Sequence, residues 1–95
     1  MPMPGDVVVC DFQGVQGVKR RPAVVVSTDV YHANCADVVT AELTTQMMKA
    51  RQPTSYVVQD WSAAGLRQPS VFRCYFSMAF QTHVLLIGRL TDRDW

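Results

Sequence analysis

The chain has 95 residues, and its 9 basic and 8 acidic side chains leave a formal net charge of +1. This length fits one small domain, and the near-neutral charge excludes a strong positive field over the whole molecule that would attract nucleic acid. Apolar residues make up 48% of the chain and charged residues 18%, so the composition excludes a disordered protein.

The three cysteines show neither CxxC spacing nor a paired histidine, which argues against a metal site of the zinc type. An odd number of cysteines without a signal peptide fits a reducing compartment, and we therefore expect a cytoplasmic protein. No apolar run approaches the roughly 20 residues of a membrane span, so we expect no membrane partner.

Short runs of β-branched and aromatic residues alternate with turn residues along the chain. This pattern predicts six strands, at residues 7–12, 23–28, 38–44, 55–60, 70–76 and 83–90. The segments 13–20, 29–37 and 47–54 are expected to be loops. Helical periodicity is nearly absent, which favours an all-β barrel or sandwich. At the end of the chain, Thr91 and Asp94 have the spacing of a capping box, which predicts one helical turn.

Three cations, Lys19, Arg20 and Arg21, stand directly before Pro22 and an apolar run at 23–26. The run shows no polar alternation, so it is expected to be a strand buried on both faces. A residue before proline favours extended backbone, which would hold a cation at the mouth of that strand. The alternative is that the three cations form an ordinary solvated loop.

The opening GDVVVCDF, the glycine-containing loop, the segment KRRPAVVVS and the LTTQ that ends the third strand together resemble the MazF/PemK toxin family. GLRQPSVF and IGRLTDRDW agree more loosely. The resemblance covers nearly the whole chain and implies a single domain over 1–95. The implied fold is mainly β, a compact SH3-like barrel of the CcdB type with about six strands, little helix, and a C-terminal helix that is short or missing.

The resemblance also implies an mRNA interferase, a sequence-specific endoribonuclease that needs neither metal nor cofactor. Such toxins form homodimers, and a cognate antitoxin neutralises them by laying its tail across the RNA site. Without a metal, RNA is cut when its own 2′-hydroxyl attacks the adjacent phosphorus. By the resemblance Arg21 and Thr44 are catalytic: Arg21 can stabilise the phosphate charge and could donate a proton, while Thr44 adds a hydroxyl donor. The general base is open between His32, Asp11 and positioning without a base.

Further polar and basic side chains are expected to bind single-stranded RNA: Gln16, Lys19, Arg20, Thr45, Gln46, Lys49 and Arg51. Gln16 takes the position where some family members carry a glutamate. Single-stranded RNA is also recognised by stacking of its bases on aromatic rings, for which Tyr31, Tyr56 and Trp61 are candidates, with core or dimer packing as the alternative.

Two other functions compete with the ribonuclease. One is a catalytically inactive relative that still binds antitoxin. The other is a CcdB-like toxin that acts on DNA gyrase, which the C-terminal position of Trp95 superficially suggests. CcdB toxins lack the RP and TTQ motifs that this sequence carries.

Overall fold

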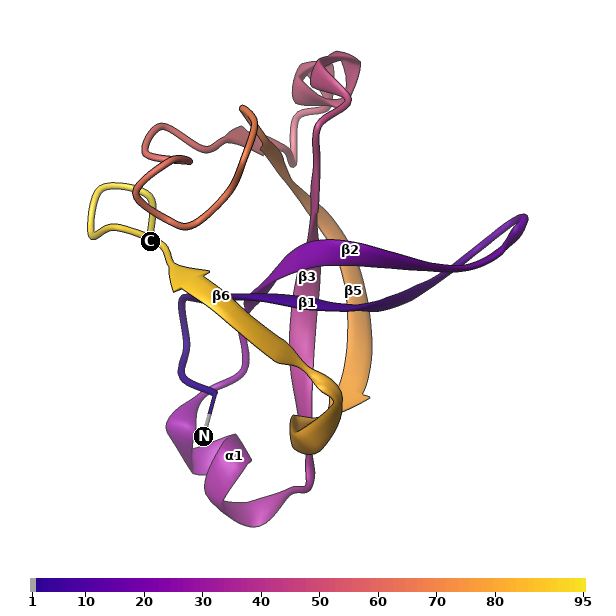
Figure 1. Cartoon of the computed structure of the whole chain (residues 1–95), viewed down its shortest axis with the longest axis vertical. Helices are drawn as coiled ribbons and strands as arrows, with labels where there is room; N and C mark the ends of the chain where they lie inside the picture. The colour runs from indigo at the N-terminus through magenta and orange to yellow at the C-terminus, as the bar shows by residue number, and fades with distance from the viewer. Residues whose placement is uncertain (1) are drawn as a thin grey trace.

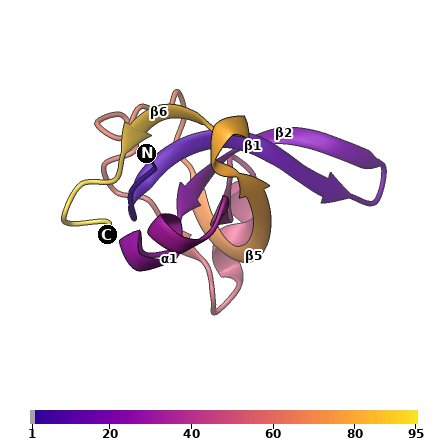
Figure 2. The ribbon, with the colours of Figure 1, turned by 90° about the horizontal axis from the view of Figure 1, so that it is seen from below.

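The computed structural model describes residues 2–95. Its six strands form one antiparallel sheet in the order β4-β5-β3-β2-β1-β6. The strands are β1 (Asp6–Gly14), β2 (Gly17–Val25), β3 (Asp37–Thr44), β4 (Tyr56–Val57), β5 (Val71–Phe80) and β6 (Leu85–Arg89). The sheet curls into a half-barrel (Figures 1 and 2), which confirms the mainly β prediction.

The segment 13–20 is part of a long hairpin, and its prediction as a loop was wrong. The β1–β2 register continues outward to the pair Gly14 and Gly17, so the hairpin projects from the body of the sheet (Figure 1). Gly17 has a φ of +113°, a conformation that glycine adopts without strain. Only Val15 and Gln16 remain as the turn, because two residues suffice to reverse a β-hairpin.

Two other predicted loops contain short helices. Asp29–Asn34 forms α1, and the Thr28 side chain caps it by accepting a hydrogen bond from the Tyr31 backbone N–H at 3.3 Å. Met47–Arg51 forms the 3₁₀ turn η1, and Gln81–His83 forms a second, η2. These elements are shorter than the window of about 11 residues over which helical periodicity becomes visible.

The core lies on both faces of the inner strands. Val7 and Val24 belong to one buried cluster, whereas Val8, Ala23 and Val25 belong to another. The prediction that the strand after Pro22 is buried on both faces is therefore confirmed. None of the helices within residues 2–95 is long and apolar enough to cross a membrane.

The C-terminal turn is held by side chains of a distant segment. The backbone N–H groups of Asp94 and Trp95 donate to the Thr91 carbonyl at 3.0 Å, so the predicted single turn is present. The capping-box roles were wrong, because the Thr91 hydroxyl donates to an Asp60 carboxylate oxygen at 2.6 Å. The Asp94 carboxylate instead accepts from the Tyr56 hydroxyl at 2.6 Å and from the Asp60 backbone N–H at 2.7 Å.

Candidate active site

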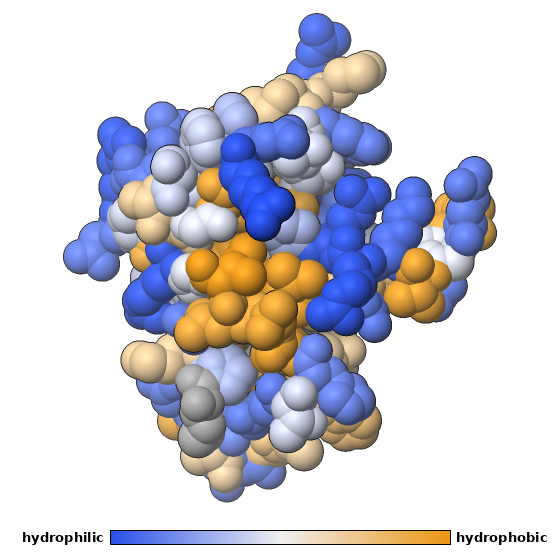
Figure 3. Space-filling view, viewed as in Figure 1, coloured by the Kyte–Doolittle hydropathy of each residue, from blue (hydrophilic) through white to orange (hydrophobic). Residues whose placement is uncertain are grey.

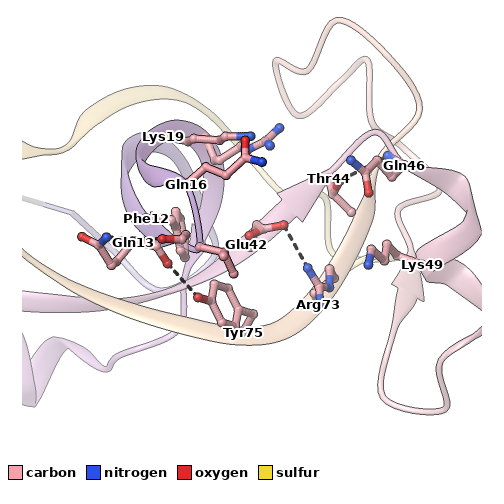
Figure 4. A pocket seen from close by; sticks show the side chains of 13 residues that line it. Phe12, Gln13, Gln16, Lys19, Glu42, Thr44, Gln46, Lys49, Arg73 and Tyr75 are labelled. Carbon is pink, nitrogen blue, oxygen red and sulfur yellow. Dashed lines mark hydrogen bonds and ion pairs between the residues drawn. The ribbon is translucent and has the colours of Figure 1, made fainter.

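An open pocket of about 490 Å³ lies between the β1–β2 hairpin and the ends of β3 and β5 (Figure 4). Its lining residues are Phe12, Gln13, Gly14, Val15, Gln16, Lys19, Arg21, Glu42, Thr44, Gln46, Lys49, Arg73 and Tyr75. Four of these side chains are cations, and one, Glu42, is a carboxylate. The pocket is therefore a local basic site on a molecule whose net charge is only +1.

Arg21 stands in β2 directly before the buried part of that strand. Its partner on β1 is Cys10, which carries no charge, whereas the neighbouring Arg20 faces Asp11. Within residues 2–95 Arg21 makes no ion pair and no side-chain hydrogen bond. Its guanidinium is thus available for two parallel hydrogen bonds to a phosphate.

Thr44 ends β3 and reaches the same pocket. The pairing of β2 with β3 sets Ala23 against Glu42, and the same register continued by two residues brings Arg21 level with Thr44. The Gln46 backbone N–H donates to Thr44 Oγ1 at 3.2 Å, which orients the hydroxyl. Its own hydrogen has no acceptor in the described part of the chain, so it can be donated to a ligand.

Glu42 and Arg73 form an ion pair inside the pocket, with 3.4 Å between Arg73 Nη1 and Glu42 Oε1. A β-bulge brings them together. On β3 and β5, Ala41 pairs with Phe76 but Leu43 pairs with Phe72, so three β5 residues lie against the single Glu42. Bulges re-aim side chains in this way and are common beside functional sites.

Tyr75 is the third pocket residue that the bulge supplies, and it is held from three sides. Its hydroxyl donates to the Gln13 backbone carbonyl at 2.8 Å. Its ring stacks on Phe12, with 6.0 Å between centroids and 25° between planes. The Arg73 guanidinium carbon lies over the Tyr75 ring, 5.6 Å from its centre, and the residue is still 43% exposed.

The structure brings most of the sequence-predicted site residues together. Six of the nine line the pocket: Gln16, Lys19, Arg21, Thr44, Gln46 and Lys49. The other three do not. Arg20 forms an ion pair with Asp11 at 3.5 Å, Thr45 lines a separate pocket with Pro22, and Arg51 is an exposed residue at the end of η1.

Neither candidate base lies in the pocket. His32 is 3% exposed, and its Nε2 lies 2.6 Å from the Ser27 hydroxyl oxygen. Its Nδ1 is buried without a hydrogen-bond partner among residues 2–95. Asp11 lines a different pocket together with His83. The carboxylate that sequence reasoning missed as a site residue is Glu42.

The three candidate stacking rings also lie elsewhere. Tyr31 donates to the Asp37 carboxylate, and this hydrogen bond raises the pKa of Tyr31 to about 12. Tyr56 donates to Asp94, and this bond raises the pKa of Tyr56 as well. Trp61 packs against the core. The described residues contain no group of three or more His, Cys, Asp or Glu side chains arranged to hold a metal ion.

Comparisons with known proteins identify a family and a similar fold. The family model described as "PemK-like, MazF-like toxin of type II toxin-antitoxin system" matches residues 3–94. Among solved structures, a mycobacterial endoribonuclease in complex with its cognate antitoxin is similar, with a TM-score of 0.78 and 23% sequence identity. The match covers 99% of this chain and 84% of that one. No curated protein matches the sequence.

Proposed function

Because the chain belongs to the PemK-like, MazF-like toxins of type II toxin–antitoxin systems, we propose that it is an endoribonuclease that cuts single-stranded RNA without a metal. The observation that carries the proposal is the meeting of Arg21 and Thr44 in one open basic pocket. Both groups have unused donors, and donors fixed in advance stabilise charge without reorganisation during the reaction.

In the proposed reaction the 2′-oxygen of a ribose forms a bond to the adjacent phosphorus, and the bond from phosphorus to the 5′-oxygen breaks. The 2′-hydroxyl proton passes to solvent, and the leaving 5′-oxygen takes a proton that Arg21 supplies and water restores. The products are a 2′,3′-cyclic phosphate and a 5′-hydroxyl. Arg21 and Thr44 hydrogen-bond the phosphate oxygens on which charge accumulates, while Lys19 and Lys49 hold the flanking phosphates.

The proposal names no protein side chain as general base. An arginine is unsuited to that role, because its pKa exceeds about 12. Glu42 is the carboxylate that lines the pocket, but it is engaged by Arg73. The rate enhancement is therefore assigned to substrate positioning and to electrostatic stabilisation.

The proposed protein partner is a cognate antitoxin, as in the similar mycobacterial complex. A segment that covers this pocket would meet the cations Lys19, Arg21, Lys49 and Arg73. Acidic side chains would complement them. Such a segment and RNA would compete for the same pocket, which accounts for neutralisation of a toxin by occupation of its site.

We assign a homodimer to the apolar surface of β5 and β6. Five large apolar side chains there are more than half exposed: Phe76, Met78, Phe80, Leu85 and Leu86. Figure 3 shows apolar surface gathered over β6 and the adjoining β1. β6 is an edge strand of the sheet, and an exposed apolar edge is a surface that proteins normally cover.

The test is incubation of the protein with a long single-stranded RNA in excess EDTA, followed by mapping of the cut sites and their chemical ends. We expect discrete cuts with 2′,3′-cyclic phosphate or 3′-phosphate ends, and a loss of at least about a hundredfold in rate for Arg21→Ala. Arg67→Ala is the matched control, because Arg67 is exposed and lies outside the pocket.

A folded Arg21→Ala protein that cuts at the wild-type rate would overturn the mechanism. A folded wild-type protein that makes no cuts would overturn the ribonuclease assignment. It would then favour an inactive antitoxin-binding relative or a gyrase-directed toxin, which an assay of DNA supercoiling distinguishes.

A further inference from the structure

We infer that Tyr75 and Arg73 form a stacking shelf, a pair of planar groups that receives an unpaired base next to the phosphate held by Arg21 and Thr44. This inference rests on the proposed ribonuclease function and adds to it the residues that contact a base. It assigns to β5 a binding role that the sequence motifs do not indicate.

The shelf joins a phenol ring and a guanidinium, and unstacked RNA bases stack on these two kinds of plane in proteins. The Arg73 guanidinium carbon lies over the Tyr75 ring, 5.6 Å from its centre. An arginine beside an aromatic ring adds a cation–π contribution to base stacking.

The side chains of the shelf are held in place by their neighbours. The Tyr75 ring is fixed by its hydroxyl bond to the Gln13 carbonyl and by the stacked ring of Phe12. Arg73 is fixed by its ion pair with Glu42. A base that binds here does not have to order these side chains first, and this lowers the entropic cost of binding.

The shelf lies at the site proposed for the phosphate. Tyr75 is 43% exposed although its hydroxyl is bonded and one neighbour is the buried ring of Phe12. It lines the pocket that also contains Arg21, Thr44 and Lys19, and Figure 4 shows it beside Arg73. Phosphate donors and an aromatic plane in one open site match the backbone and the base of a single nucleotide step.

The test measures the affinity for an uncleavable RNA oligonucleotide. Its sequence is that of the mapped cut site, with a 2′-O-methyl ribose before the cut bond, and abasic nucleotides replace the bases one position at a time. We expect Tyr75→Leu to weaken binding of the intact oligonucleotide about tenfold. At one abasic position the difference between the variant and the wild type should vanish, because the base that used the ring is already missing.

Two further variants separate stacking from a general effect on the fold. Tyr75→Phe keeps the ring and loses only the bond to Gln13, so it should bind nearly as tightly as the wild type. Tyr56→Leu is the matched control, because Tyr56 is similarly exposed, at 40%, and also donates its hydroxyl, but lies outside the pocket. It should bind as tightly as the wild type.

If Tyr75→Leu does not fold, a second experiment replaces the binding measurement. The wild-type protein is photo-crosslinked to the same oligonucleotide carrying 5-iodouridine. A cross-link at Tyr75 supports the shelf, and cross-links only at other residues overturn it. The shelf is also overturned if Tyr75→Leu binds the oligonucleotide as tightly as the wild type, or if its loss of affinity persists at every abasic position. In either case, RNA cutting by the wild-type protein would still support the ribonuclease function. A wild-type protein that neither cuts nor binds RNA refutes the ribonuclease itself.

Discussion

Strand alternation decides which of two adjacent arginines is available for chemistry. Arg20 and Arg21 are neighbours in β2, so their side chains point to opposite faces of the sheet. Arg20 meets Asp11 across the β1–β2 ladder, whereas Arg21 meets the uncharged Cys10. The unpaired cation is therefore the one that lines the pocket, and a shift of the register by one residue would exchange the two roles.

Replacement of Thr44 by valine should lower kcat for RNA cleavage by about a hundredfold and leave KM nearly unchanged. The valine keeps the shape of the side chain but removes the hydroxyl, which is proposed to act on charge that develops in the transition state. Thr44→Ser retains the hydroxyl and should keep most of the activity. Steady-state kinetics with a short RNA measure both constants.

Thr45→Val is the neighbouring comparison. Thr45 lines the separate pocket that contains Pro22, so this variant should keep wild-type kcat. Equal losses for the two valine variants would contradict the role given to Thr44.

The pocket residues that sequence reasoning predicted lie near the two motifs, and those it missed include Glu42 on β3 and two residues of β5. Arg21 and Thr44 stand next to a proline and at the end of a polar strand, which are visible locally. Arg73 and Tyr75 reach the pocket only because β5 pairs with β3 through a bulge at Glu42. That pairing joins residues about 30 positions apart, and neither propensity nor alternation along one strand specifies it.

At the scale of elements, the existence of the strands was predictable and their extents were not. Each predicted run overlaps the strand that forms, but the bounds differ: the run 23–28 shares only its first three residues with β2, and the run 70–76 ends before β5 does. The outer half of the β1–β2 hairpin carries polar residues such as Gln13 and Lys19. These residues adopt strand conformation because β1 and β2 pair with each other. The strand predicted at 55–60 shrinks to Tyr56–Val57, since the following residues bind the C-terminal turn instead.

Gly88→Ala should destabilise the protein by about 2 kcal/mol or more, because β6 lies against the backbone of the turn at residues 59–65. A Cβ at Gly88 would lie 1.9 Å from the Ala64 carbonyl oxygen, and only a shift of backbone could relieve that contact. For a domain of this size the loss corresponds to a fall of about 10 °C in the melting midpoint.

Gly17→Ala provides the contrast. It meets nothing within 4 Å but has a φ of +113°, so it tests backbone strain without a clash and should cost only about 1 kcal/mol. Thermal unfolding of both variants measures the order. A Gly88→Ala protein as stable as the wild type would show that β6 does not pack on this turn.

The network around Asp60 and Asp94 should make stability fall in acid. The Arg93 guanidinium and then the Thr91 hydroxyl lower the pKa of Asp60. Burial raises the pKa of Asp94, but hydrogen bonds from the Tyr56 hydroxyl and two backbone N–H groups outweigh it and leave that pKa lowered too. A carboxyl group whose pKa is lower in the folded state stabilises the fold at pH values above its unfolded pKa of about 3.9. This stabilisation is lost as the pH falls through the folded pKa.

The melting midpoint of the wild type should therefore drop steeply below about pH 4. Asp60→Asn should melt lower at pH 7 and show a shallower drop in acid, because one of the two carboxylates no longer titrates. Asp92→Asn is the control, since Asp92 is exposed and makes no side-chain hydrogen bond within residues 2–95. An acid profile of Asp60→Asn that parallels the wild type would contradict the role of this network.

For the whole molecule, charge and apolar surface are separated. Three of the five Lys and Arg residues that make no ion pair within residues 2–95 line the pocket beside the hairpin: Lys19, Arg21 and Lys49. Exposed leucines and phenylalanines lie on β5 and β6. A 95-residue chain buries a modest share of its surface on folding, and part of the apolar area left outside lies on the edge strand β6, at Leu85 and Leu86. This division suits a dimer that buries β6 while both pockets stay open to RNA.

Leu86→Glu should convert the proposed dimer to a monomer or raise its dissociation constant on the order of a hundredfold, because a carboxylate would be buried without a partner. Leu86 is 62% exposed in the single chain, so the change should leave the monomer fold intact. Val30→Glu, at a 74% exposed position on α1, places the same charge away from β6 and should leave the dimer unchanged. Sedimentation equilibrium over a range of concentrations measures both constants. A wild-type protein that sediments as a monomer at high concentration would show that the β6 edge is not covered by a second copy. If both substitutions dissociate the dimer equally, the interface lies elsewhere.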